Sequence, residues 1–216
     1  MKTKTAGNIL VILGLCLIFC AFGLICHNMY DADQAEQSSL KAVSELVQVL
    51  PSEVVPAEQF TPEYIAEAVI QEEPVEIPYF VLNPQIEMLE EEINGIAYVG
   101  ILEIPNLGLE LPVASTWSKP NAKVAPCRYK GSVYLDDMII CAHNFKNHFG
   151  RLSTLSVGDA VSFTDMEGNC FTYQIMEFEV LNGTAIEQME SGDWDLTLFT
   201  CTAGGKARFT VRCERI

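Results

Sequence analysis

The sequence has little positive charge and few histidines. Its 13 lysines and arginines stand against 29 aspartates and glutamates, and there are three histidines. No region has the basic excess that neutralising nucleic-acid phosphates requires, which argues against a nucleic-acid partner. The sequence also lacks a CxxC motif or a His/Cys ligand cluster, so we expect no metal site. We expect no cofactor either.

The negative charge is concentrated in the middle of the chain. Residues 31–95 carry 15 acidic residues against Lys41 alone, whereas residues 96–216 carry 14 acidic and 10 basic residues. Six of the ten prolines lie between Pro51 and Pro84. This composition predicts an extended, self-repelling stalk over residues 27–92. Within it, residues 31–50 predict a short juxtamembrane helix, with one face made of Leu40, Val43, Val47 and Leu50.

The N-terminus carries a long apolar run. From Ile9 to Cys26 no residue is charged, and as a helix this run would be about 27 Å long, close to the bilayer core of about 30 Å. No small-x-small cleavage site follows it, although a cleaved signal peptide remains the alternative. Lys2 and Lys4 predict a cytoplasmic tail over residues 1–8 and a single-pass anchor in the cell membrane over 9–26, with the rest of the chain outside the cell.

From residue 93 onward the pattern changes to short strands separated by glycine and proline. This all-β pattern predicts one folded domain over residues 93–216, either a closed barrel or a sandwich. We expect a hairpin turn at residues 165–169 and short helical pieces at Phe149–Leu155 and Ala185–Glu190. The eight expected strands are Tyr98–Ile104, Leu109–Val113, Ser132–Leu135, Met138–Ala142, Ala160–Thr164, Phe171–Leu181, Leu196–Thr200 and Arg208–Glu214.

Five cysteines follow the apolar run, and an odd number leaves at least one of them free. Cys201 is set apart because it ends an apolar strand and precedes a glycine-containing loop. The other four lie in or beside expected strands, where a cysteine is a small core residue or takes part in an occasional disulfide. They are Cys127, Cys141, Cys170 and Cys213.

Two further residues have the chemistry to assist a cysteine nucleophile. If the last two strands pair as a hairpin, Arg208 lies opposite Cys201 and brings a permanent cation close to its sulfur. His143 directly follows an apolar strand, whereas His148 lies five residues further along a polar loop, so His143 is the better candidate base. A buried cysteine beside an exposed arginine, a surface histidine, or a His143–His148 metal pair remain alternatives.

These residues carry a family resemblance. Thr197-Leu198-Phe199-Thr200-Cys201 matches the TLxTC signature of sortases, and Arg208 follows at the expected short distance. Ala142-His143-Asn144 resembles the strand-end histidine of the family, and Gly100–Pro105 resembles its opening strand. The resemblance covers residues 93–216 and implies an eight-stranded sortase-type β-barrel.

The resemblance also implies a mechanism and its partners. Cys201 would attack the threonine carbonyl of an LPxTG-like sorting signal on a surface protein and form a thioester. His143 would act as general acid and base, Arg208 would stabilise the oxyanion, and Thr200 would add a hydrogen bond near the substrate. A cell-wall precursor or another amine acceptor would then resolve the thioester. Arg212, four residues beyond Arg208, lies too far from Cys201 for a direct role.

The sequence also bears on subclass and on rival functions. Without a lid before the barrel or a second hydrophobic segment after Ile216, we expect an enzyme that anchors proteins and does not polymerise pili. The stretch 182–195 is short for the class that carries a long helical insertion there. A membrane-anchored cysteine protease that only hydrolyses and a noncatalytic surface β-domain are the rival hypotheses.

Overall fold

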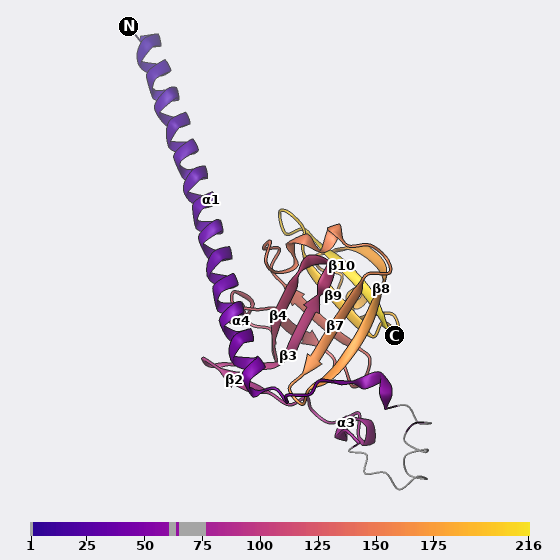
Figure 1. The fold of residues 1–216 in the computed structure, drawn as a ribbon. Coiled ribbons are helices and arrows are strands. Elements are labelled where there is room, and N and C mark those ends of the chain that lie inside the picture. The colour runs from indigo at the N-terminus through magenta and orange to yellow at the C-terminus, as the bar shows by residue number, and fades with distance from the viewer. Residues whose placement is uncertain (1, 61–63, 65–76) are drawn as a thin grey trace.

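The computed structural model describes residues 2–60, 64 and 77–216, and Figure 1 shows a long N-terminal helix beside a β-barrel. The helices are α1 (Lys2–Val49), α3 (Tyr79–Leu82), α4 (Lys119–Ala122) and α5 (Ile186–Glu190), with 3-10 turns η1 (Ala57–Gln59), η2 (Pro105–Leu107) and η3 (Phe149–Thr154). The strands are β1 (Val55–Pro56), β2 (Glu91–Ile93), β3 (Ile96–Ile104), β4 (Leu109–Ala114), β5 (Cys127–Lys130), β6 (Met138–Ala142), β7 (Ala160–Asp165), β8 (Asn169–Asn182), β9 (Leu196–Cys201) and β10 (Ala207–Arg215).

Eight of the described strands close into a barrel. The hydrogen-bonded order runs β8-β10-β9-β6-β5-β4-β3, and β7 pairs with both β3 and β8 to complete the ring. The short strands β1 and β2 extend the sheet beside β8 and β3. Closure leaves few free edges and encloses one apolar core, because alternate side chains of each strand point inward. The expected all-β barrel is confirmed.

Seven of the eight expected strands are present, and one was misplaced. Ser132–Leu135 forms a turn, and the missing strand is β5, directly before it. The apolar pair Val133 and Tyr134 suggested a strand, but both side chains are buried by packing from the turn. β5 reads Cys-Arg-Tyr-Lys, whose polar side chains hid its strand character because three of the four are outside the core.

Helix α1 is continuous through the boundary between the expected anchor and the expected stalk. Its large apolar side chains from Leu10 to Ile25 are exposed, and by length and composition this is the one described helix able to cross a membrane. Its second half packs against the barrel through Ala35, Ser39 and Leu46, which are buried. Of the apolar face expected from the sequence, Val43 is buried and Leu50 is half-buried, whereas Leu40 and Val47 are exposed. The small side chains Ala35, Ser39 and Ala42 allow the helix to approach closely, and the larger Val43 and Leu46 are also buried in this contact.

The expectation of an extended stalk is therefore wrong for most of its described length. Beyond α1, Val55 and Pro56 pair with β8, and the α3 residue Phe80 enters the core and stacks on Tyr134 with ring centroids 4.9 Å apart. Residues 61–63 and 65–76 of the expected stalk lie outside the described residues. Burial of this apolar surface outweighs the mutual repulsion of the exposed acidic side chains, so the segment folds against the barrel.

Candidate functional site

Three neighbouring strands bring the predicted catalytic residues to one end of the barrel. Strands β6 and β9 run parallel with Ala142 opposite Thr200, so the next residues, His143 and Cys201, leave adjacent strands at the same end. Strand β10 pairs antiparallel with β9 and sets Arg208 directly opposite Cys201. The hairpin register expected from the sequence is confirmed. Neighbouring strands are about 4.8 Å apart, so Cys201 lies between His143 and Arg208.

The three side chains line one cavity of about 450 Å³. Cys201, His143 and Arg208 are each half-buried, which leaves them reachable from solvent. The remaining lining is mostly apolar and aromatic, as in sites that hold an extended peptide by its side chains. These further lining residues are Trp117, Lys119, Ala122, Lys123, Tyr129, Cys141, Ala142 and Phe199.

The histidine of the cavity is favoured in its neutral form. Burial lowers the pKa of His143 below its usual value, the Lys123 ammonium lowers it further, and the Asp31 carboxylate of α1 acts in the opposite direction. The ring also packs on Phe145, with centroids 4.9 Å apart. A neutral imidazole at the end of a strand can accept a proton from a neighbouring thiol.

The other four cysteines past the apolar run are free, and burial makes their thiols poor nucleophiles. Burial raises the pKa of Cys127 to about 11 and of both Cys141 and Cys213 to about 12, and it raises the pKa of Cys170 as well. Although Cys127 and Cys141 are paired across β5 and β6, both remain thiols. Among the described residues, none of the four forms a disulfide. Cys201 differs from them because it ends β9 between the end of β6 and Arg208 of β10.

Thr200 is turned away from the cavity. It is buried, and its hydroxyl donates a 2.9 Å hydrogen bond to the carbonyl of Ala142, the residue before His143. It is not among the residues that line the cavity. The hydroxyl therefore ties β9 to the end of β6, and a contact between Thr200 and substrate stays a prediction.

His148 supports the loop that follows His143. Its ring is fully buried, and Nε2 lies 3.2 Å from the Ser39 hydroxyl of α1. Ser39 already donates its proton to the Val124 carbonyl at 2.7 Å, so Nε2 must carry the proton and donate to Ser39. Phe145 packs between the two histidine rings. Helix α1 thus braces the loop from 143 to 150.

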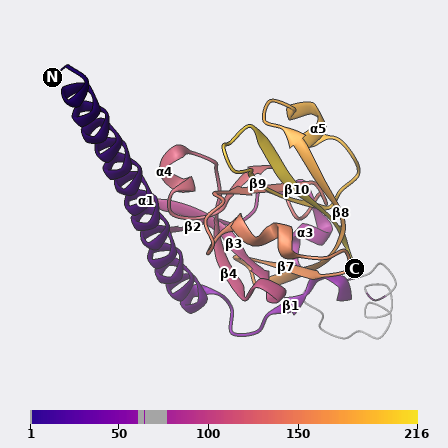
Figure 2. The ribbon, with the colours of Figure 1, turned by 90° about the horizontal axis from the view of Figure 1, so that it is seen from above.

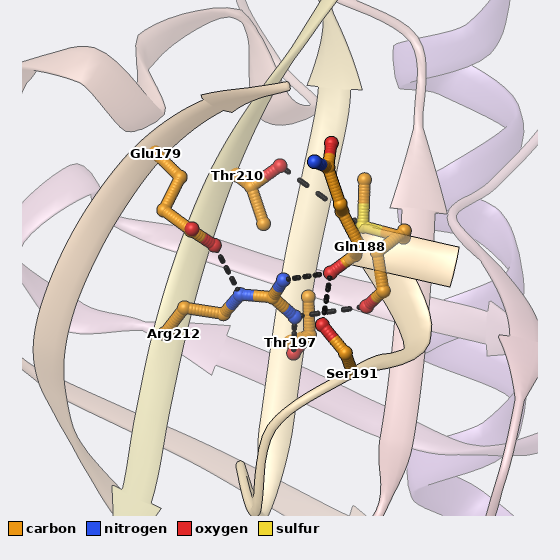
Figure 3. Close-up of polar contacts among 7 residues, drawn as sticks. Glu179, Gln188, Ser191, Thr197, Thr210 and Arg212 are labelled. Atoms are coloured by element: carbon orange, nitrogen blue, oxygen red, sulfur yellow. Dashed lines mark hydrogen bonds and ion pairs between the residues drawn. The ribbon is translucent and has the colours of Figure 1, made fainter. Parts of the chain in front are cut away.

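Arg212 is held in a buried network beside the site (Figure 3). Its guanidinium donates to Glu179 at 2.7 Å, to the Thr197 hydroxyl at 3.0 Å, and to the carbonyls of Gln188 and Met189 at 2.8 and 2.9 Å. The two carbonyls belong to α5, so Arg212 fixes that helix against β9 and β10. Its distance from Cys201 was anticipated, but its structural role was not.

Sequence reasoning missed the contributions of the 115–126 loop and of α1. Trp117, Lys119 and Lys123 line the cavity, and Ser39 contacts His148 across 109 positions of sequence. Trp117 could have been found, because an exposed tryptophan in a loop often marks a binding surface. Ser39 offered no signal, since a serine within a helix has no distinctive pattern.

Comparison with known proteins identifies the family. The Sortase domain family matches residues 102–216. Among solved structures, the sortase D5 transpeptidase of Clostridium perfringens has a TM-score of 0.50 at 22% identity, covering 58% of this chain and 82% of that chain. Sortase C1 from Streptococcus agalactiae gives 0.51 at 23%, covering 58% and 70%, and sortase A from Corynebacterium diphtheriae gives 0.51 at 15%, covering 86% and 84%.

At these identities the structural likeness shows the fold, and it does not decide between the sortase classes. The curated proteins compared with the chain include no match. The family match covers more than half of the chain and includes all three strands that converge on the cavity. The protein belongs to the sortase family.

Proposed function

We propose that this sortase cleaves a C-terminal LPxTG-like sorting signal and transfers the surface protein to a cell-wall precursor or another amine acceptor. The observation that carries the proposal is the register of β6, β9 and β10, which brings His143, Cys201 and Arg208 to one cavity. A nucleophile, a base and a cation on adjacent strands are the groups that acyl transfer needs.

The first half of the reaction forms a thioester. His143, neutral in the resting site, accepts the Cys201 proton as sulfur attacks the threonine carbonyl carbon of the sorting signal. The peptide C–N bond then breaks, and the departing amine takes the proton from the His143 imidazolium. The apolar and aromatic lining, including Phe199, suits the leucine and proline of such a signal.

The second half releases the product. The amine acceptor attacks the thioester carbonyl, its nitrogen gives a proton to neutral His143, and the sulfur leaves as thiolate and is reprotonated from His143. Arg208 is a guanidinium cation that cannot serve as the base, so its task is to stabilise the oxyanion and hold the substrate backbone. In the resting structure its guanidinium donates to the carbonyls of Gly205 and Ala207, which keeps it on the β9–β10 loop.

The location of the enzyme follows from α1. We propose that residues 9–26 cross the cell membrane, that residues 1–8 remain cytoplasmic, and that the barrel at 93–216 lies outside the cell. Residues 27–92 join these parts, with α1 passing from the anchor directly to the barrel.

A transfer assay tests the proposal. The detergent-solubilised full chain is incubated with a labelled sorting peptide, with and without an added amine, and intact mass detects the acyl-enzyme. We expect a thioester adduct on the wild type and an amide product when the amine is present. Cys201→Ala abolishes both, whereas Cys170→Ala, which removes a half-buried thiol outside the cavity, retains both.

The same assay separates the rival functions. Cleavage that is identical with and without amine, with no transfer product, would identify a protease that only hydrolyses. Trapping of peptide by Cys201→Ala at the wild-type level would overturn the assignment. His143→Ala and Arg208→Ala test the roles of the base and the cation, since each should lose thioester formation by at least about 10²-fold while the fold persists.

A further inference from the structure

Three connections gather at the site end of the barrel. The 115–126 loop joins the end of β4 to the start of β5, which pair at Ala114 and Cys127. Cys127 in turn lies opposite Cys141, near the end of β6, where the 143–150 loop begins. The 202–206 loop joins β9 to β10 beside Cys201. The register therefore sets all three loops at the same end.

These three loops have a uniform charge. They contain four lysines and no acidic residue, although residues 96–216 as a whole carry an excess of four negative charges. All four lysines are exposed, and within the described residues none forms an ion pair. We call this set the basic rim, and its members are Lys119, Lys123, Lys146 and Lys206.

The positive charge lies on the side of the barrel next to α1. The 183–195 connection starts at the site end, where it carries Glu187 on α5, and it reaches the opposite end of the barrel at Asp193 and Asp195, just before β9. Figure 2 shows α5 of that connection across the barrel from α1, whereas α4 of the 115–126 loop lies against α1. The lysine-bearing 115–126 loop and α5 therefore lie on opposite sides of the barrel, and the acidic side chain beside the rim is Asp31 of α1, which acts on His143.

Helix α1 sets the height of the basic rim above the membrane. The Ser39 hydroxyl bonds the Val124 carbonyl, and the Asp31 carboxylate acts on His143, so α1 runs past the rim toward its apolar half. At 1.5 Å per residue, Asp31 is about 7.5 Å and Ser39 about 20 Å beyond Cys26, where the apolar run ends.

The polar headgroup layer is about 5–8 Å thick on each side of the bilayer core. The rim loops thus begin where that layer ends. In Figure 1 the β9–β10 turn, drawn in yellow, points toward the N-terminal half of α1, and Lys206 belongs to this turn. Because α1 is one continuous helix packed on the barrel, no flexible spacer separates the barrel from the membrane.

We propose that the basic rim contacts the anionic headgroups of the membrane that holds α1, so that the Cys201 cavity opens at the bilayer surface. This rests on the proposed membrane span of residues 9–26. Each lysine near an anionic surface is worth about fivefold in binding, and the attraction falls off within about 8 Å. A cavity held there faces substrates that are themselves attached to the membrane.

Two tryptophan reporters test the proposal. Trp194 precedes β9 at the end opposite Cys201, about 20 Å along the barrel, and it serves as the control in Trp117→Phe protein, where it is the one remaining tryptophan. Ala203, exposed in the 202–206 loop, is replaced in Trp117→Phe, Trp194→Phe protein by tryptophan. Each full chain is reconstituted into nanodiscs that contain a headgroup spin-labelled lipid, with either phosphatidylcholine alone or an equal mixture with phosphatidylglycerol.

In the anionic nanodiscs we expect strong quenching of the Ala203→Trp reporter and little quenching of Trp194. Lys146→Gln/Lys206→Gln, two changes outside the cavity, should shift the docked-to-free ratio by on the order of 25-fold and reduce the quenching of the loop reporter. The quenching of the loop reporter should also be weaker in nanodiscs of phosphatidylcholine alone than in the anionic nanodiscs.

The proposal would be overturned if the two reporters were quenched equally. It would also be overturned if quenching of the loop reporter were the same with and without anionic lipid and with and without the two lysine changes. The proposal would also fail if the basic rim bound only substrate. In that case Lys119→Gln/Lys123→Gln would raise the KM for an acidic peptide and leave the quenching of the loop reporter unchanged. Failure of the anchor itself gives a different result, because the chain would not be retained by the nanodiscs. Thioester formation with a soluble peptide reports on the proposed chemistry independently of all these outcomes.

Discussion

Acidification should destabilise this protein through His148. The ring is fully buried, and burial together with the neighbouring His143 lowers the pKa of His148 to about 4 from an ordinary value of about 6.5. Nε2 donates to Ser39, while Nδ1 has no hydrogen-bond partner among the described residues. A proton on Nδ1 would therefore add a buried, unpaired charge next to α1.

The sign and size follow from these pKa values. Because the folded pKa is the lower one, the unfolded chain binds the proton first, and stability is lost as pH falls below about 6.5 toward 4. For a shift of about 2.5 units, linkage gives a loss of about 2 kcal/mol in the free energy of unfolding between pH 7.5 and pH 5. His143, whose pKa is also lowered, adds to the loss in the same direction.

The assay compares wild type with His148→Gln, in which an amide nitrogen can still donate to Ser39. Urea unfolding of the detergent-solubilised chain, followed by tryptophan fluorescence at pH 7.5 and pH 5, gives the free energy of unfolding of each protein. The titration of His143 and of the carboxylates is common to both and cancels in the comparison. We expect the wild type to lose about 2 kcal/mol more than the variant. The same pH dependence in both proteins would refute the reasoning.

Three further substitutions test the supports of the site. Arg212→Met leaves two α5 carbonyls unpaired, so we expect about 3 kcal/mol of destabilisation and a raised peptide KM, with Arg212→Lys intermediate in both measurements. An unchanged KM would mean that α5 does not shape the site. Ser39→Ala should lower the free energy of unfolding by about 1–3 kcal/mol, whereas Ser44→Ala, on the exposed face of α1, should change it by less than about 0.5 kcal/mol. Gly131 and Gly95 both have positive φ, but only at Gly131 would a methyl group overlap a neighbouring carbonyl, so Gly131→Ala should lower the melting temperature more than Gly95→Ala.

The barrel strands could be predicted because their local pattern and their tertiary environment agree. Strand β6 is an unbroken apolar run and is buried throughout, and β9 ends in the TLxTC signature at the cavity. The positions of Cys201 and Arg208 then needed only the hairpin register, which two short strands with a short loop largely fix. His143 followed from the end of β6.

The contacts of α1 could not be predicted in the same way. Its packed face includes Ala35, Ser39 and Ala42, small residues that a search for large apolar side chains passes over, beside the larger Val43 and Leu46. The composition of the segment after α1 is acidic and proline-rich because most of its side chains are exposed. The few side chains that are buried decide the structure of its described part. Phe80 shows this, since it belongs to the one short apolar run of that segment, Tyr79–Leu82, and its ring packs in the core against Tyr134 and Phe171.

These contacts change which part of the chain forms the structural unit. The loop after His143 has two supports: β6 holds its start, and Ser39 of α1 holds His148 near its end. A fragment that begins after α1 would keep the three catalytic strands but lose the hydroxyl that fixes His148. In the proposed mechanism His143 must stay within hydrogen-bond reach of the groups it serves, so we expect loosening of this loop to reduce catalysis with Cys201 and Arg208 unchanged. Among the described residues, the folded unit therefore begins at about Ala35 in α1, and α1 contributes both the proposed membrane span and the support of His148.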